Sequence, residues 1–161
     1  MPDFYEIDFL DVETAKSGDA IALRFLCGHR VLLTGDAGVG GLTETIACAS
    51  YIGLHLPGLD RFQVPHHGAR RNLNTGTLDR LLGPRSPTRS AAAPRFFAII
   101  SSAEADEDHP RKVAIRSMIH RGGQVLTTEG NALWVYGGAA PSRAGAYNPV
   151  TPLPYPEEQE T

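Results

Sequence analysis

The segment 31–72 limits the fold more than any other part of the chain, because it alternates apolar runs with polar, glycine-rich elbows. An apolar run at 31–34 precedes a glycine-rich loop and then a helical pattern, and a second apolar run follows at 59–64. This strand–helix–strand order is typical of parallel strands joined by a crossover helix. We therefore expect an α/β fold.

Both of these predicted strands end in residues that can hold a metal ion. Asp36 follows the first strand, and His66 and His67 follow the second, directly after Pro65. The carboxyl ends of neighbouring parallel strands meet at one edge of a sheet, where ligands usually bind. Asp36 and the histidine pair should therefore lie close together in space.

The same residues also have simpler interpretations. Asp36 could cap the helix that follows it, and the histidine pair could consist of ordinary exposed loop residues. Arg70 and Arg71, next to the pair, are typical either of phosphate contacts or of a solvated basic turn. A nucleotide-binding loop is disfavoured, because Gly41 stands where that motif requires its lysine.

The rest of the pattern predicts further strands and helices. Strands are expected at 4–12, 20–26, 96–101, 125–128 and 132–136, and helices at 42–51, at 75–82 and from 109 to about 121. The continuous apolar run at 96–101 is typical of a strand buried on both faces. The ring of His109 is expected to cap or shape its loop rather than to bind a metal.

The sequences LLTGDAG and VPHHGARRN resemble the second half of metallo-β-lactamase-fold hydrolases. The similarity is to the branch that contains the soluble domain of ComEC, the competence channel for DNA uptake. FLDVETAKSGDAIAL resembles the opening strand pair of that branch, and SSAEADEDHPRKV resembles its serine strand and His-Pro helix start. The resemblance implies an αββα layer architecture, here incomplete, with a mixed sheet and about three helices.

The resemblance also implies a metal site. Asp36 would bridge two metal ions, one of His66 and His67 would be a ligand, and Asp19 corresponds to a position near the site. We expect weakly held Zn²⁺ or Mn²⁺, with Asp36 and His67 as catalytic residues for hydrolysis of (phosphodi)esters. The family's main metal motif, H-x-H-x-D-H, does not occur in the chain. Because a catalytic zinc requires three protein ligands, we expect this hydrolysis to be impaired.

Two other functional hypotheses stay open beside the hydrolase. In the first, the chain is a catalytically silent binding module. In the second, it is a shortened gene product that lost its activity with the missing motif. The resemblance implies that the complete fold of the family stacks two sheets, each covered on its outer side by helices. This chain supplies little more than one sheet with its helices. One sheet face should therefore lack cover, and we expect a homodimer or a partner chain to cover it.

Composition and charge set further expectations. Residues 1–136 should form one domain, and the Gly- and Pro-rich acidic tail at 137–161 should pack loosely. With a net charge of −3, the chain as a whole does not attract nucleic acid, so any phosphate contact must be local. No apolar run approaches the ~20 residues that cross a bilayer, and Cys27 and Cys48 form no disulfide framework. The expected location is the cytoplasm.

Overall fold

The computed structural model describes residues 21–24, 29–89, 92–103, 106, 108–130, 133 and 150–158. Three sequence predictions lie outside these residues: the strand at 4–12, the metal-site role of Asp19, and the state of Cys27. The predicted strand at 132–136 also lies outside them, apart from Leu133.

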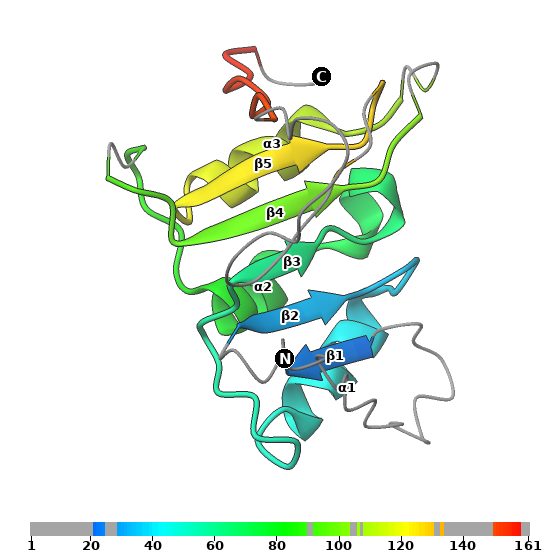
Figure 1. Cartoon of the computed structure of the whole chain (residues 1–161), viewed down its shortest axis with the longest axis vertical. Helices are drawn as coiled ribbons and strands as arrows, with labels where there is room; N and C mark the ends of the chain where they lie inside the picture. The colour runs from blue at the N-terminus through cyan, green and yellow to red at the C-terminus, as the bar shows by residue number, and fades with distance from the viewer. Residues whose placement is uncertain are drawn as a thin grey trace, which may run out of the picture.

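A five-stranded mixed sheet forms the centre of the described structure (Figure 1). Its spatial order, β1-β2-β3-β4-β5, is the order of the strands in the sequence. β1 runs antiparallel to β2, whereas β2, β3, β4 and β5 are parallel to one another. The strands span Ile21–Arg24 (β1), Arg30–Leu33 (β2), Arg61–Gln63 (β3), Phe96–Ile100 (β4) and Gly123–Thr127 (β5).

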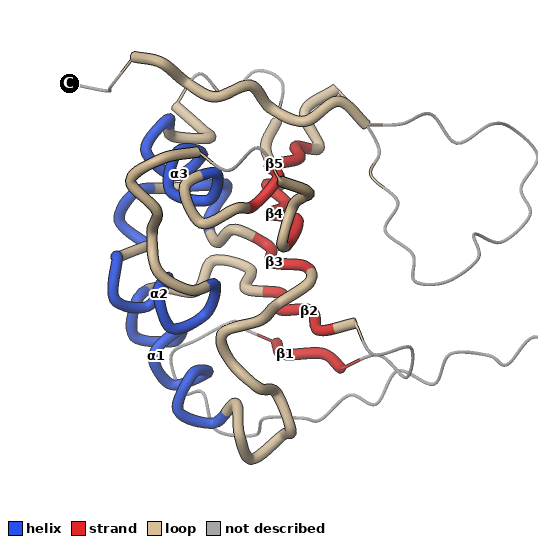
Figure 2. Tube along the Cα trace, turned by 90° about the vertical axis from the view of Figure 1, so that its left-hand side faces the viewer, coloured by secondary structure: helices blue, strands red, loops and turns tan. Residues whose placement is uncertain are grey.

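A helix joins each parallel strand to the next, and the helices lie on one face of the sheet (Figure 2). They span Val39–Cys48 (α1), Thr75–Leu82 (α2) and Lys112–Ile119 (α3). Crossovers between parallel strands are almost always right-handed, so strands added in one direction place their helices on one side. The predicted α/β class, with a mixed sheet and three helices, is confirmed for the part of the chain that the structure describes.

The hydrophobic core lies between the sheet and this helix layer. Side chains in register across the four parallel strands form its base and are at most 1% exposed: Leu32, Phe62, Ala98 and Val125. Buried residues of the helices pack on them, among them Leu42, Leu78, Leu81, Ile115 and Met118. Burial of this apolar surface, worth about 25 cal/mol per Å², stabilises the packing of the helices on the sheet.

The opposite face of the sheet is less covered. Phe97 and Ile99 of β4 are only half-buried, so the prediction of a strand buried on both faces is wrong. The physical reason is that successive side chains of a strand point to opposite faces, and the described helices cover one face only. Leu33 is 39% exposed, and the Arg61 guanidinium lies 4.5 Å from the centroid of the Phe97 ring.

Several element boundaries differ from the predictions. α2 has the predicted bounds, but α1 begins earlier than expected, at Val39. Pro110 does not stand in the first turn of a helix, because α3 begins at Lys112 with Arg111 as its N-cap. Within the described residues, no helix is both long and apolar enough to cross a bilayer.

The C-terminal segment 150–158 packs against α3 and β5. The Leu153 amide donates to the Val125 carbonyl at 2.8 Å, and the Tyr155 hydroxyl lies 2.9 Å from Nε2 of buried His120. Arg116 donates to two carbonyls of this segment, at 3.1 and 3.2 Å. The expectation of a loosely packed tail is therefore wrong for these residues, because apolar and aromatic side chains anchor them.

Candidate functional site at the carboxyl edge of the sheet

The loops that follow β2 and β3 are fastened to each other at the carboxyl edge of the sheet. The His66 amide donates to the Gly35 carbonyl at 3.0 Å. On the last residue of β3, the Gln63 side-chain oxygen accepts from the amides of Thr34 and Gly35, at 3.0 and 3.3 Å. These bonds bring the loop of Asp36 beside the loop of the histidine pair.

Asn72 provides a second connection between the two loops. Its side-chain amide donates to the carbonyls of Asp36 and Ala37, each at 3.2 Å. Asn72 therefore positions the Asp36 loop through its backbone and leaves the Asp36 carboxylate available.

Asp36 does not act as the cap of the following helix. The N-cap of α1 is Gly38, and no side chain accepts a hydrogen bond there. The Asp36 side chain is exposed and makes no hydrogen bond or ion pair within the described residues. The simpler interpretation of Asp36 is thus wrong, whereas its role as a metal ligand stays a prediction.

The histidine pair has a backbone conformation that residues with side chains rarely adopt. The φ angle is 47° at His66 and 54° at His67, in the short 3₁₀ turn His66–Gly68. A left-handed residue other than glycine costs about 1–2 kcal/mol, and such residues cluster at functional sites. Both imidazoles are exposed, so this backbone presents them to solvent at the edge of the sheet.

His109, from the segment before α3, lies beside the pair. Its ring centroid is 6.2 Å from that of His66 and 6.5 Å from that of His67, while the rings of the pair are 5.9 Å apart. We call His66, His67 and His109 the histidine edge. The sequence predicted the first two as site residues, but it did not predict that His109 joins them.

Gly68 allows this close approach. Its φ angle is +84°, and a Cβ atom added there would lie 3.0 Å from Cβ of Pro110. The Gly68 carbonyl also accepts from the Arg111 amide at 3.3 Å. The segment before α3 therefore packs directly on the backbone of the histidine loop.

Two of the three imidazoles have one nitrogen fixed by an oxygen acceptor. Nδ1 of His67 bonds to the Ser101 carbonyl, and Nδ1 of His109 lies 3.1 and 3.3 Å from the Asp106 carboxylate oxygens. Because a carbonyl or a carboxylate can only accept, Nδ1 carries the proton in the neutral form of each ring, and Nε2 then keeps its lone pair. This is the arrangement by which proteins orient metal-binding histidines.

Asp106 is itself held by its neighbours. Partial burial raises the pKa of Asp106, but three hydrogen bonds and one charge outweigh that effect and hold the pKa below its usual value. The bonds come from the Asp108 amide at 3.0 Å, from the His109 ring and from the His109 amide at 3.1 Å, and the charge is that of His109. Asp106 therefore stays ionised near neutral pH and orients His109.

The donor set matches a transition-metal ion in chemistry, but its side chains stand too far apart to surround one. In the part of the chain that the structure describes, no three His, Cys, Asp or Glu side chains are close enough to hold a metal ion as they stand. Imidazoles with free Nε2 atoms are the commonest protein ligands of zinc and related ions. The arrangement can thus accept an ion only with adjustment of its loops.

Sequence reasoning missed the residues that position this edge. Gln63, Asn72 and Asp106 act through hydrogen bonds rather than as ligands. Only Asp106 carries a usable sequence signal, since it stands three positions before a histidine. The predicted phosphate contacts, Arg70 and Arg71, are exposed in the 3₁₀ turn Arg70–Asn72 that follows the histidine pair.

No family model, curated protein or solved structure matches the chain. The relation to metallo-β-lactamase-fold hydrolases therefore remains a proposal that rests on the motifs alone.

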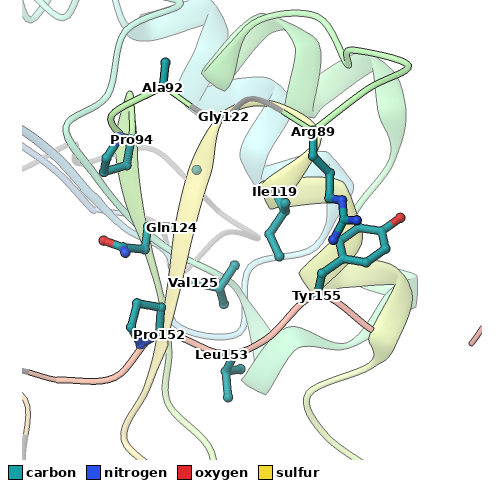
Figure 3. Close-up of a pocket in the computed structure, with 11 residues that line it drawn as sticks. Arg89, Ala92, Pro94, Ile119, Gly122, Gln124, Val125, Pro152, Leu153 and Tyr155 are labelled. Carbon is teal, nitrogen blue, oxygen red and sulfur yellow. The ribbon is translucent and has the colours of Figure 1, made fainter. Parts of the chain in front are cut away.

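A cavity of about 450 Å³ lies elsewhere, at the amino end of β5 (Figure 3). Gly123 and Val125 of β5 line it together with Leu153 and Tyr155 of the C-terminal segment. The Arg89 guanidinium lies 4.3 Å from the centroid of the Tyr155 ring, and Figure 3 shows the two side by side. None of the predicted site residues lines this cavity.

Proposed function

We propose that this chain is a metallo-hydrolase-like module that binds one Zn²⁺ or Mn²⁺ ion weakly at the histidine edge. His67 and His109 would be the principal ligands, His66 a third, and Asp36 the anionic ligand. One observation carries the proposal: two neighbouring imidazoles each have Nδ1 held by an oxygen acceptor and Nε2 left available.

The residues at this site would have separate roles. The Ser101 carbonyl and the Asp106 carboxylate orient His67 and His109. A bound divalent ion would supply Lewis-acid polarisation of an ester oxygen. Hydrolysis of phosphodiesters is the ancestral chemistry that the family resemblance implies, and we propose that it is impaired here, because a two-metal site requires more ligands than this edge offers.

A catalytically silent binding module is the second candidate. Exposed Leu33 and half-buried Phe97 and Ile99 on the sheet face opposite the helices favour it, since uncovered apolar surface marks contact sites. The partner would be a second copy of the chain or a different protein. Light scattering tests this candidate: a dimer whose association weakens in Leu33→Ser supports it, and a strict monomer that captures no partner opposes it.

A Co²⁺ titration followed by visible absorption, with Zn²⁺ competition, tests the metal proposal. We expect fewer than two equivalents to bind, and His67→Ala and His109→Ala to abolish most of the spectral change. Asp106→Asn should weaken binding about tenfold, because it removes the group that orients a ligand. Binding should also weaken in mild acid, since only neutral imidazole binds a metal.

The matched control is His55→Ala, which removes an exposed histidine from the loop between α1 and β3. Its binding should equal that of the unaltered chain. Equal weakening in His55→Ala and His67→Ala would contradict the proposal. Two tightly bound equivalents together with turnover of an aryl phosphodiester, lost in Asp36→Ala, would show instead that hydrolysis is not impaired.

A further inference from the structure

A pocket lined by four arginines opens between α2 and α3, on the helix side of the sheet. Its volume is about 300 Å³, and none of the three histidines of the histidine edge lines it. The residues that line it include four arginines and two residues with hydroxyl groups: Arg70, Arg85, Arg116, Arg121, Thr75 and Ser117. We call it the arginine pocket.

Arg121 is the arginine of this pocket whose side chain is buried and held in place by hydrogen bonds. It is 2% exposed, and its Nη2 donates to Oδ1 of Asp79 at 2.6 Å. Its Nη1 donates to the carbonyl and the hydroxyl of Ser117, at 3.0 and 2.7 Å. The Nε–H is buried and has no acceptor within the described residues. A buried donor without a partner is rare in native proteins, and this one belongs to a residue that lines the pocket.

Among the described residues, no carboxylate forms an ion pair with the other three arginines of the pocket. Arg70 and Arg85 are exposed, and their side chains make no ion pair or hydrogen bond among the described residues. Arg116 is held by the C-terminal segment, whose carbonyls accept from it, and its guanidinium lies 5.0 Å from the centroid of the Tyr155 ring. Asp79 offsets the charge of Arg121 alone, so the pocket keeps an excess of positive charge.

We propose that the arginine pocket binds a phosphate group carried by a small molecule. A guanidinium group binds two phosphate oxygens through two parallel hydrogen bonds, whereas a lysine ammonium acts as a point charge. A pocket lined by arginines therefore suits a phosphate group. The volume is at the lower end of small-molecule sites. A nucleic-acid backbone fits less well, because the chain as a whole has a net charge of −3.

Calorimetric titration of the full chain with pyrophosphate tests this proposal. A chelator is present throughout, so that a metal at the histidine edge cannot bind the probe. Arg70→Gln and Arg85→Gln should each weaken pyrophosphate binding about tenfold, the loss expected for one charge-assisted contact. Neither substitution should affect folding, because both side chains are exposed and make no polar contact.

Arg80→Gln is the matched control, since Arg80 is an exposed arginine of α2 that does not line the pocket. Its affinity for pyrophosphate should equal that of the unaltered chain. Equal weakening in all three variants would mean diffuse charge attraction and would overturn the proposal, as would the absence of saturable binding. A single-stranded oligonucleotide that binds more tightly than pyrophosphate, and loses affinity in the same variants, would overturn the small-molecule assignment.

Discussion

The histidine edge and the arginine pocket belong to the same helix–sheet unit, but different forces hold their side chains in place. The histidines stand on exposed loops that backbone hydrogen bonds fasten, and His66 and His67 have left-handed backbone conformations. The arginine pocket depends on one buried guanidinium, Arg121, which is paired with Asp79. Substitution of the exposed imidazoles themselves should therefore cost little stability, whereas loss of the carboxylate that pairs with Arg121 should cost much more.

Asp79→Ala should give the largest effect, a loss of about 2–3 kcal/mol in the free energy of unfolding. The substitution leaves Arg121 as a buried charge without an anionic partner, and the partial exposure of Asp79, 38%, keeps the loss below that of a fully buried pair. Urea denaturation measures it. Glu157→Ala breaks the exposed pair with Arg89 and should cost less than about 0.5 kcal/mol; equal losses would mean that water already screens Arg121.

Gly68→Ala should lower the free energy of unfolding by about 2 kcal/mol and carry His109 away from the pair. The new Cβ would meet Pro110 at 3.0 Å in a residue whose φ angle is +84°. Gly130→Ala is the control, because its φ angle is +63° with nothing within 4 Å, so it should cost only about 1 kcal/mol. If the two variants lose the same stability, the contact between the two loops does not constrain the histidine edge.

His66→Gly should raise the free energy of unfolding by about 0.5 kcal/mol while it weakens metal binding. Glycine adopts the left-handed conformation of His66 without a steric penalty. His55→Gly, at a position without a positive φ angle, should instead lower stability by about 0.5 kcal/mol. Thermal and urea unfolding of both variants measure the difference, and a loss of stability in His66→Gly would show that the loop stores no strain.

The smallest effect concerns pH and Asp106. The pKa of this carboxyl is lower in the folded chain than its usual value, so its contribution to stability is present above that usual value and is lost as pH falls through the lower one. Asp106→Asn should therefore be less stable than the unaltered chain at pH 7. The difference should begin to shrink near roughly pH 4, the usual value, and should vanish only below the lower pKa of the folded chain. Urea denaturation across this range checks the sign; a difference that grows in acid would contradict it.

Much of the fold could be predicted from the sequence. The bounds of α2 were predicted correctly, and the strand–helix–strand order predicted parallel strands whose loops meet at one edge. These features depend on contacts within an element or between consecutive elements. Burial on both faces of β4 was predicted wrongly, because an apolar run does not reveal which face the helices cover.

The positioning of the candidate site could not be predicted in the same way. Gln63 and Asn72 hold the Asp36 loop through hydrogen bonds from side chain to backbone, and such bonds produce no periodic pattern in the sequence. His109 meets the histidine pair only because Pro110 packs on Gly68. Periodicity and strand order gave no reason to place His109 beside the histidine pair.

The pattern of residues was enough to predict the order of strands and helices and the two strand ends that carry Asp36 and the histidine pair. The folded chain was needed to show that His109 lies beside the pair and that four arginines distant in sequence line one pocket. The difference lies in the distance along the chain over which each effect acts. Periodicity and turn chemistry act over a few residues, whereas the meeting of charged side chains depends on how α2 and α3 pack on the sheet, which the whole apolar core sets.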